Sequence, residues 1–346
     1  MQAAVFKGDG VLELTERPKP KLEQRTDALI RVTGVGICGT DLHILQVPPA
    51  HPAKQGIIEG HEFTGVIEEL GDDVAGFEVG EAVLINPHPG CGVCAECRRG
   101  RPDRCTPLYE SSPEEGHPDT IGIFSDGAMA SQVLVPRQSL YKVDAAVPSH
   151  IAALAEPLAC VVNASEMVTV QPSDFVVVLG AGPIGLLFTA MMRAGGASKL
   201  IVSEPSTYRR EAARAVGADM VVHPDQLPLT LAAEMPDGAD LVVEAVGPLL
   251  PQAIHIARTG GRVLQFGHDE SVEPKIPVGE LLKKELTIHG AFIGRHSFEK
   301  AARIMESGKL PLEKVVSHRL PLSKVHEGLE LLRSGNGLKI ILEPEA

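Results

Sequence analysis

The sequence predicts an α/β protein of two domains, in which a doubly wound parallel sheet is joined to a mainly β domain with a cysteine-rich lobe. Residues 1–149 consist of short apolar runs separated by glycine and proline turns. From residue 150 onwards, strand-like runs alternate with helix-like segments, which is typical of a parallel sheet covered by helices. The 346 residues also exceed the size, about 250–300 residues, at which single cores stop growing.

The first domain is expected to begin with an edge strand and a hairpin within residues 1–18. Further strands are predicted at 28–37, 62–70 and 81–87. Apolar and polar residues alternate imperfectly along these runs, which favours a barrel that folds over itself rather than a flat sheet.

The second domain is predicted over residues 150–291. It opens with a helix at 151–168, for which Ser149 is the candidate N-cap. The run FVVVL at 175–179 is suited to a buried parallel strand. The remaining elements are helices at 184–194 and 209–216 and strands at 199–203, 220–222, 240–246, 262–267 and 285–292.

The C-terminal tail, residues 292–346, is expected to return to the first domain. It contains two amphipathic helices, at 297–307 and 322–334, and one last strand at 338–342. A single strand makes no sheet of its own, so we expect the tail to pack on residues 1–149 and complete that domain.

Charge and hydropathy exclude several classes of partner. The net charge of −13 argues against nucleic acids and anionic membranes. No apolar stretch reaches the roughly 18 residues of a membrane span, and the N-terminus lacks the features of a signal peptide. Because the cysteines are better explained as metal ligands than as disulfides, we expect a cytoplasmic protein without nucleic-acid or membrane partners.

Four of the six cysteines form a compact cluster within the lobe at 88–108. Cys91, Cys94, Cys97 and Cys105 follow the spacing C-x2-C-x2-C-x7-C. Four thiolates can fill all positions of a tetrahedral Zn²⁺, which makes such a site structural rather than catalytic. The alternatives are an iron–sulfur cluster and four unrelated free thiols.

A glycine-rich turn between the strand at 175–179 and its helix predicts a dinucleotide site. The residues Gly180, Gly182, Pro183, Ile184 and Gly185 form a complete G-x-G-x-x-G motif. The glycines allow a tight turn and close approach of a pyrophosphate, which the helix N-terminus attracts. The second domain is therefore predicted to be a Rossmann domain. The alternative is a turn that only packs helix against strand.

Glu204, at the end of the next strand, favours NAD over NADP. A carboxylate there can accept hydrogen bonds from the ribose hydroxyls and repels a 2′-phosphate. In the alternative interpretation, Arg209 and Arg210 clamp a phosphate. Such cations more often flank the adenine, and Arg209 is included among the predicted cofactor-binding residues.

A second group of potential metal ligands lies in the first domain. Cys38 and His61 are the soft ligands of an open zinc site, and Asp41 could orient the imidazole of His61. Glu156 is the best candidate for a third ligand because Pro157 after it begins a helix and fixes its direction. Each residue also has a structural interpretation, as a buried hydrophobe, a satisfied histidine or a helix-terminal carboxylate.

These motifs together resemble the zinc-containing medium-chain alcohol dehydrogenases over nearly the whole chain. The resemblance rests on GVGICGTDLH at 34–43, GHE at 60–62, the four-cysteine lobe, AEPLA at 155–159 and VLGAGPIG at 178–185. It implies a GroES-like catalytic domain, two zinc ions per chain and NAD as cofactor.

The resemblance also implies roles for individual residues. Cys38, His61 and Glu156 match the ligands of the catalytic zinc. Glu62 matches an acidic residue that either contacts the metal or interacts with the residues that bind it. A glutamate at the position of Glu156 resembles the sorbitol and threonine dehydrogenase branches. Cys160 is a weaker alternative ligand, since on the helix it is expected to pack in the core.

For the reaction, the resemblance implies zinc-assisted hydride transfer from an alcohol to NAD. Thr40 and His43 match the positions that carry the proton to solvent. A non-enzymatic structural or regulatory relative is the alternative of another class, but such relatives usually lose the zinc ligands that this chain retains.

Two substrate classes are compatible with these motifs. The EPLA run and the segment 290–310 favour a polyol or sugar-derived secondary alcohol, which is our first expectation. The run SEPSTYRRE at 203–211, together with His88, Arg295 and His296, favours L-threonine. His88 could equally be a surface loop residue. These side chains are polar, so a small hydrophobic alcohol is not expected.

The strand at 285–292 also predicts the assembly. It is apolar and lies at the edge of the predicted sheet, where it can pair with a second copy across a two-fold axis. The resemblance implies the same, and we expect a homodimer or homotetramer. The alternative is a monomer whose edge is shielded by Lys283, Lys284 and Glu285.

Overall fold

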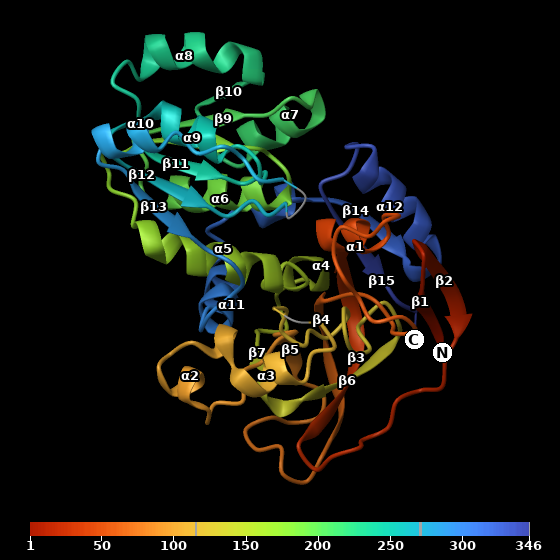
Figure 1. Cartoon of the computed structure of the whole chain (residues 1–346). Helices are drawn as coiled ribbons and strands as arrows, with labels where there is room; N and C mark the ends of the chain where they lie inside the picture. Colours follow the sequence, from red (N-terminus) through yellow and green to blue (C-terminus); the bar gives the residue numbers. More distant parts are fainter. Residues whose placement is uncertain (115, 270–271, 346) are drawn as a thin grey trace. The chain divides into compact units, whose positions relative to one another are not determined.

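The computed structural model describes residues 1–114, 116–269 and 272–345. The chain divides into two compact units (Figure 1). The first comprises Met1–Ala159, Arg295–Ser307 and Val316–Ala346, and the second comprises Cys160–Gly294 and Gly308–Val315. No helix in the described part of the chain is long and apolar enough to cross a bilayer.

The first unit is built on antiparallel β structure. The expected N-terminal hairpin is confirmed as β1 (Gln2–Gly8) and β2 (Val11–Glu16), which form a sheet of their own. The strands expected at 28–37, 62–70 and 81–87 are confirmed, with slightly different ends. They form a seven-stranded sheet in the order β14-β15-β3-β4-β5-β7, in which β6 also pairs with β3. Their bounds are β3 (Asp27–Ile37), β4 (Glu62–Leu70), β5 (Ala82–Ile85), β6 (Gln132–Pro136) and β7 (Leu140–Lys142).

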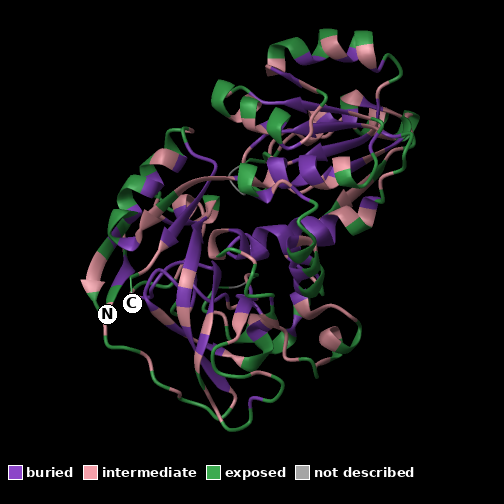
Figure 2. Cartoon of the chain, turned by 180° about the vertical axis from the view of Figure 1, so that it is seen from behind, coloured by how far each residue is buried: buried purple, intermediate pink, exposed green. Residues whose placement is uncertain are grey.

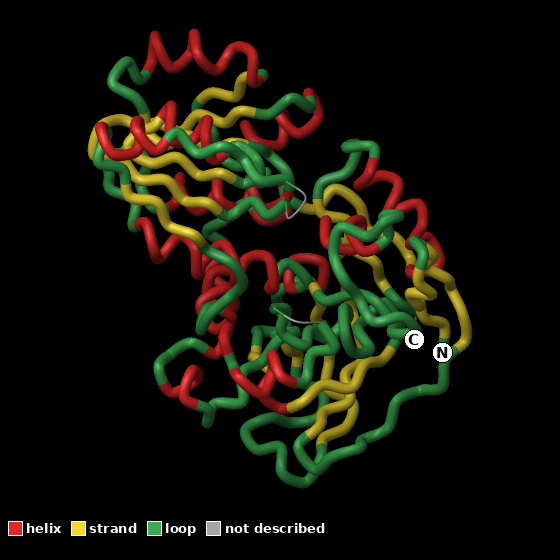
Figure 3. Tube along the Cα trace, in the orientation of Figure 1, coloured by secondary structure: helices red, strands yellow, loops and turns green. Residues whose placement is uncertain are grey.

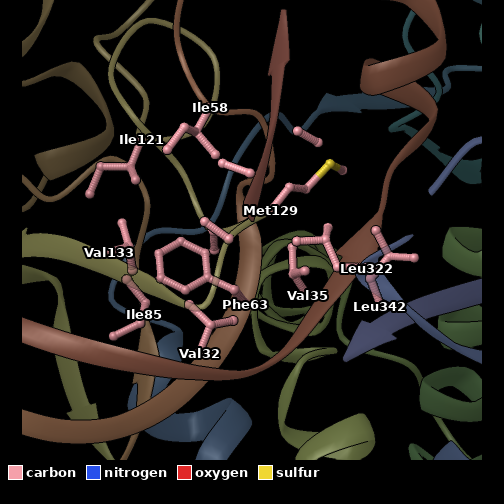
Figure 4. Packing of buried hydrophobic residues seen from close by; sticks show 14 of the residues in the cluster. Val32, Val35, Ile58, Phe63, Ile85, Ile121, Met129, Val133, Leu322 and Leu342 are labelled. Atoms are coloured by element: carbon pink, nitrogen blue, oxygen red, sulfur yellow. The ribbon is translucent and has the colours of Figure 1, made fainter. Parts of the chain in front are cut away.

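The core of this unit lies where β3 and β4 meet the strands beside them. Phe63 is fully buried, and Figure 4 shows its ring among the side chains of Val32, Ile85 and Val133. These apolar side chains come from four different strands, so the sheet has to fold over to enclose them. The ends of β3 and β4 next to this core carry the residues of the candidate metal site.

The helix expected at 151–168 is broken into α4 (Ser149–Ala152) and α5 (Ala155–Val168). Pro157 explains the break, because it has no N–H to donate to the carbonyl of Ala153 four residues earlier. The expected N-cap is also wrong by one residue. Ser149 is the first residue of α4, and Pro148 is its N-cap.

The tail is divided between the two units: 295–307 and 316–346 belong to the first, and 308–315 belongs to the second. It forms α11 (Phe298–Ser307), β14 (Val316–Pro321), α12 (Val325–Arg333) and β15 (Lys339–Glu343). The strand β15 pairs antiparallel with β3, and β14 pairs parallel with β15. The sequence did not predict β14, whose pattern of half-buried residues gives no clear alternation.

The second unit contains the predicted doubly wound sheet. Its six strands run parallel in the order β10-β9-β8-β11-β12-β13, which places the first strand, β8, in the middle. Figure 2 shows the central strands β8, β9 and β11 largely buried, and Figure 3 shows helices on both faces of the sheet. The strands are β8 (Phe175–Leu179), β9 (Lys199–Ser203), β10 (Met220–Val222), β11 (Ala239–Glu244), β12 (Ala257–Gln265) and β13 (Thr287–Gly290).

Two helices of this unit match the prediction closely, and three were not predicted. The matches are α6 (Pro183–Ala194) and α7 (Thr207–Ala215). The additional helices are short: α8 (Leu227–Glu234), α9 (Leu250–Ile256) and α10 (Val278–Lys283). In addition, β12 begins five residues before the expected start at 262, because it continues through the glycine pair at 260–261.

Candidate metal and cofactor sites

Cys38 lies at the junction between β3 and the short helix α1 (Gly39–Ile44), where it is the N-cap. Its backbone N–H donates a hydrogen bond of 2.8 Å to Oδ2 of Asp41, in the first turn of that helix. This local bond satisfies a free amide at the helix start and fixes the direction of Cys38. Thr40 lies on the same turn, with its Oγ1 3.6 Å from Sγ of Cys38.

His61 and Glu62 lie where a tightly held loop enters β4. Gly60 precedes them with a φ of +100°, and a Cβ there would lie 2.8 Å from Cγ of Met129. Only glycine tolerates both the left-handed backbone and this close approach. The loop therefore delivers His61 in a fixed position, with its Nδ1 3.5 Å from Oδ1 of the fully buried Asp41.

Cys38, His61 and Glu62 form one group of potential metal ligands. One ligand atom from each lies within 4.8 Å of the others. Burial alone would lower the pKa of His61, but the charges of Cys38 and Asp41 and a hydrogen bond with Cys38 raise it well above its ordinary value. A thiolate, an imidazole and a carboxylate suit Zn²⁺. The concentration of negative charge around the imidazole also fits a bound cation.

Lys339, which the sequence did not single out, pairs with Glu62. Its Nζ lies 2.5 Å from Oε2 of Glu62 and donates a further hydrogen bond of 3.1 Å to the carbonyl of Ile37. Both side chains are buried. Burial opposes the charge on Lys339, but Glu62, Cys38 and Glu156 together raise its pKa. The available signal was a lysine on an apolar strand, where a buried charge requires a partner.

The other predicted catalytic residues belong to the same unit. Glu156 is almost buried in the first turn of α5, and its charge acts on Lys339. Among the described residues, the group of ligand atoms within 4.8 Å comprises Cys38, His61 and Glu62, so Glu156 lies outside it. His43 is half-buried in the last turn of α1.

The charge of His61 acts on His88, and the charge of Arg295 acts on Asp103. His88 is buried rather than on the surface, and its Nε2 has no hydrogen-bond partner. Burial and the charge of His61 lower the pKa of His88 to about 4, against the opposing effect of Asp103. Although burial acts in the other direction, Arg101 and Arg295 lower the pKa of Asp103. His296, by contrast, is exposed and has a φ of +50°.

The four lobe cysteines are arranged as ligands of one ion. Their sulfur atoms lie within 4.8 Å of one another, and all four are free thiols. Sγ of Cys94 and Sγ of Cys105 are 4.0 Å apart, which is much too long for a disulfide. A tetrahedral ion with Zn–S bonds of about 2.3 Å separates its sulfurs by roughly 3.8 Å. The observed spacing therefore fits zinc.

The lobe backbone supports this arrangement. N–H groups of Cys91, Cys94 and Cys97 point at the sulfurs of Cys105, Cys91 and Cys94, at 3.2, 3.3 and 3.5 Å. Such donors stabilise thiolates, the form that binds metals. The short helix α2 (Ala95–Arg98) and the turn at Pro102–Arg104 hold these amides in place.

The glycine motif of the second unit has the geometry of a dinucleotide loop. Gly180 has a φ of +95°, and a Cβ on Gly185 would lie 2.1 Å from the carbonyl oxygen of Gly180. These two glycines are therefore needed for the turn itself. Gly182 is the N-cap of α6, and the nearest atom to a Cβ there is Nη1 of Arg209 at 4.0 Å. This position leaves room for a ligand at the helix N-terminus.

Glu204 links this loop to the next. Its Oε2 accepts a hydrogen bond of 2.7 Å from the N–H of Ala181, and its Oε1 accepts one of 2.9 Å from Ser206. Arg210 donates to the backbone carbonyls of Glu204 and Pro205. Nε of Arg209 is buried without a hydrogen-bond partner. Arg209 is thus the cation beside the glycine loop, whereas Arg210 is held by the backbone.

Comparisons with known proteins agree with both units. Residues 24–145 match the alcohol dehydrogenase GroES-like domain, and residues 183–307 match the zinc-binding dehydrogenase domain. The L-threonine 3-dehydrogenase of Pyrococcus horikoshii is 35% identical over 95% of this chain and 94% of its own length. The erythritol/L-threitol dehydrogenase of Mycolicibacterium smegmatis is 33% identical over 99% of this chain and 98% of its own.

Solved structures give the same result. A zinc-binding dehydrogenase from Sinorhizobium meliloti bound to NADP superposes with a TM-score of 0.90, at 28% identity and 99% coverage of both chains. An alcohol dehydrogenase from Escherichia coli in complex with NADH superposes with a TM-score of 0.88, at 27% identity and 99% coverage of both chains. The chain therefore belongs to the zinc-containing medium-chain alcohol dehydrogenase family.

Proposed function

We propose that the protein is a zinc- and NAD-dependent dehydrogenase that oxidises a secondary alcohol of a polyol or sugar-derived substrate to a ketone. The observation that carries this proposal is the group of the half-buried Cys38 and the buried His61 and Glu62, whose ligand atoms lie within 4.8 Å of one another. When bound, zinc supplies a Lewis acid for the alcohol oxygen and NAD supplies the acceptor for the hydride.

The chain's own residues provide the remaining functions. Cys38 and His61 would hold the ion, and Glu62 or Glu156 would complete its ligands. The alcohol carbon gives up a hydride, and its hydroxyl gives up a proton. The hydroxyl of Thr40, whose Oγ1 is 3.6 Å from Sγ of Cys38, relays this proton by accepting it while donating its own. His43, half-buried on the same helix, passes it on to solvent.

The test separates the two chemical parts of the protein. Cys38→Ser and His61→Ala should each abolish turnover. Titration with NAD should show affinity near that of the wild type, because the glycine loop belongs to the other unit. Substantial activity in either variant would show that this metal-based mechanism is wrong.

L-threonine is the second candidate substrate. It is favoured by the buried, unpartnered Nε2 of His88 and by the cationic side chain of Arg295, which acts on Asp103 and suits a carboxylate. Because the chain is similar to threonine dehydrogenases, L-threonine is supported about as well as a polyol substrate. Initial rates with a panel of polyols and with L-threonine decide between them. Arg295→Gln should raise KM for L-threonine much more than KM for an uncharged polyol.

We propose NAD rather than NADP as the preferred cofactor. The carboxylate of Glu204 is held against the glycine loop, where it opposes a 2′-phosphate. Glu204→Ala should reduce the ratio of kcat/KM for NAD to kcat/KM for NADP. Equal kcat/KM values in the wild type would assign a phosphate-binding role to Arg209.

We also propose a second, structural zinc in the cysteine lobe. Metal analysis after exhaustive dialysis should give about two ions per chain, and Cys97→Ser should lose one of them. The same variant should unfold at lower urea concentration, because metal binding contributes to local folding. A fully metallated and stable Cys97→Ser protein would contradict the structural role.

A further inference from the structure

Glu244, the last residue of β11, is a fully buried acidic residue that the proposed reaction does not use. Its Oε1 accepts hydrogen bonds from the backbone N–H groups of Val246 at 2.9 Å and Gly247 at 2.8 Å. These two residues belong to the β11 loop, residues 245–247. A buried carboxylate needs such donors, so the loop is folded around the side chain that precedes it.

Glu244 also holds the β12 loop, residues 266–269. Its backbone carbonyl accepts a hydrogen bond of 2.9 Å from the N–H of Gly267. Gln265, the last residue of β12, donates from Nε2 to Oε2 of Glu244 at 2.5 Å. The same amide nitrogen is within hydrogen-bond distance of the carbonyls of Gly247, at 3.2 Å, and Gly267, at 2.9 Å. The two side chains therefore tie the two loops to each other.

The β11 loop lies directly against the glycine turn of the proposed dinucleotide site. The N–H of Ala245 donates to the last carbonyl of β8 at 3.0 Å, and a Cβ on Gly180 would lie 2.7 Å from Cγ2 of Val246. The two loops are equally close, because a Cβ on Gly267 would lie 2.2 Å from the backbone nitrogen of Gly247. A shift of one loop therefore has to move its neighbours.

Both loops follow strands at the carboxyl end of the parallel sheet. A dinucleotide binds across this end where the strand order reverses, with one mononucleotide half on each side. Here the reversal lies between β8 and β11. Because Glu204, after β9, is proposed for the adenosine ribose, the nicotinamide half would lie on the side of β11 and β12. Val246 is apolar and yet 45% exposed on this side, which suits a flat aromatic ring.

We infer that Glu244 and Gln265 are positioning residues for the nicotinamide half of NAD. They act through the β11 and β12 loops, whose backbone they hold in the conformation that accepts the ring. Without their hydrogen bonds the loops occupy that conformation for only part of the time, and the apparent affinity for the cofactor falls by that fraction. This inference rests on the proposed NAD site, but it concerns residues that shape the site from within the sheet.

The experiment compares NADH, which contains both halves of the cofactor, with AMP, which contains only the adenosine half. Glu244→Gln keeps the size of the side chain but turns an amide nitrogen towards another donor. Calorimetry on the full chain should show NADH binding weakened by about tenfold or more and AMP binding within about twofold of the wild type. The fluorescence of bound NADH should also become more similar to that of free NADH, because the ring is held less firmly.

A second variant and a matched control distinguish positioning from general loss of stability. Gln265→Leu removes the donor that the two loops share, leaves the buried carboxylate in place, and should also weaken NADH binding selectively. Asp240→Asn alters the other end of β11, where Asp240 accepts from the N–H of Phe175 at 2.8 Å and from Nε of Arg258 at 2.5 Å. This control should lower the melting temperature but leave the ratio of NADH affinity to AMP affinity unchanged.

The outcomes are separable from those that test the function. If the wild type does not bind NADH, the proposed cofactor site is wrong. If the wild type binds NADH and both Glu244→Gln and Gln265→Leu bind it as tightly, the inference about these two residues is wrong. Equal losses of NADH and AMP affinity in these variants, or a changed affinity ratio in Asp240→Asn, would show a general structural effect and would also overturn it.

Discussion

At the scale of single residues, Lys339 determines how Glu62 is held beside the candidate metal ligands. The two side chains are 3% and 2% exposed, and their charged atoms are 2.5 Å apart. Removing one partner leaves an uncompensated buried charge, so Lys339→Met should lower the free energy of unfolding by about 3–5 kcal/mol. Urea unfolding measures this change.

The matched control is an exposed ion pair in the same unit. Lys142 lies 2.6 Å from Glu81, with side chains 53% and 30% exposed. Lys142→Met should cost at most about 1 kcal/mol, because solvent screens the charges. Equal effects of the two substitutions would show that the Lys339–Glu62 pair is not electrostatically buried.

His88 predicts how stability depends on pH. Its pKa falls from an ordinary 6.5 to about 4, chiefly because it is buried. As the pH falls between these values, the unfolded chain binds a proton that the folded chain does not. The contribution of neutral His88 to the free energy of unfolding is therefore fully present above pH 6.5. It is lost as the pH falls to 4, by about 3 kcal/mol in all.

His88→Gln tests this prediction, because glutamine cannot take up the proton. Urea unfolding of both proteins should be compared over a pH series from about 4 to 7. The wild type should lose more stability than the variant as the pH falls. Acid-induced loss of metal affects both proteins and cancels in the difference. Parallel curves would mean that His88 titrates normally in the folded state.

The sequence identified Cys38, His61 and the four lobe cysteines because each lies in a local motif whose spacing has chemical meaning. Lys339 was missed because its partner, Glu62, is 277 residues away in the chain.

At the scale of elements, the glycines of the dinucleotide loop should separate folding from cofactor binding. A Cβ on Gly185 would lie 2.1 Å from a backbone oxygen, whereas a Cβ on Gly182 has open space around it. Gly185→Ala should therefore destabilise the second unit, since neither backbone can give way. Gly182→Ala should fold normally and bind NAD weakly, because the methyl group occupies the approach to the helix N-terminus.

Thermal unfolding and NAD titration of both variants measure these effects. Alanine is a better helix former than glycine, so a stability loss in Gly185→Ala cannot come from helix propensity. Normal NAD affinity in Gly182→Ala would place the pyrophosphate elsewhere.

The strands were easier to predict than the short helices. The run FVVVL matches β8 residue for residue, because consecutive β-branched side chains indicate a strand buried on both faces. Helix α8 has no comparable signal. Leu229 is 79% exposed on it, so its apolar residues do not follow one face. The break before α5 depends on one missing N–H at Pro157, which the apolar period of 151–168 conceals.

At the scale of the whole molecule, the sequence predicted that the tail returns to the first unit but not how it does so. That prediction followed from the single strand expected in the tail, because one strand cannot form a sheet alone. The strand β15 does join β3, and it brings β14 with it. Pairing between strands about 300 residues apart cannot be derived from local periodicity, because register depends on both partners.

The open edge of the parallel sheet predicts self-association. The strand β13 is an edge strand of that sheet, as expected, and an unblocked edge can pair with a second copy. The helix that precedes it, α10, exposes two apolar side chains, with Val278 56% and Leu282 68% exposed. An apolar helix face beside an open edge is suited to an isologous contact that joins two sheets across a two-fold axis.

Light scattering should therefore give a mass of at least twice 36.7 kDa for the wild type at micromolar concentration. Leu282→Glu should shift the equilibrium towards the monomer, because the contact would bury an unpaired charge. Leu229→Glu is the control, since Leu229 is equally apolar and 79% exposed but lies on α8, next to the opposite edge strand, β10. It should leave the mass unchanged. A single 36.7 kDa species in the wild type, or equal dissociation of both variants, would exclude assembly through this edge.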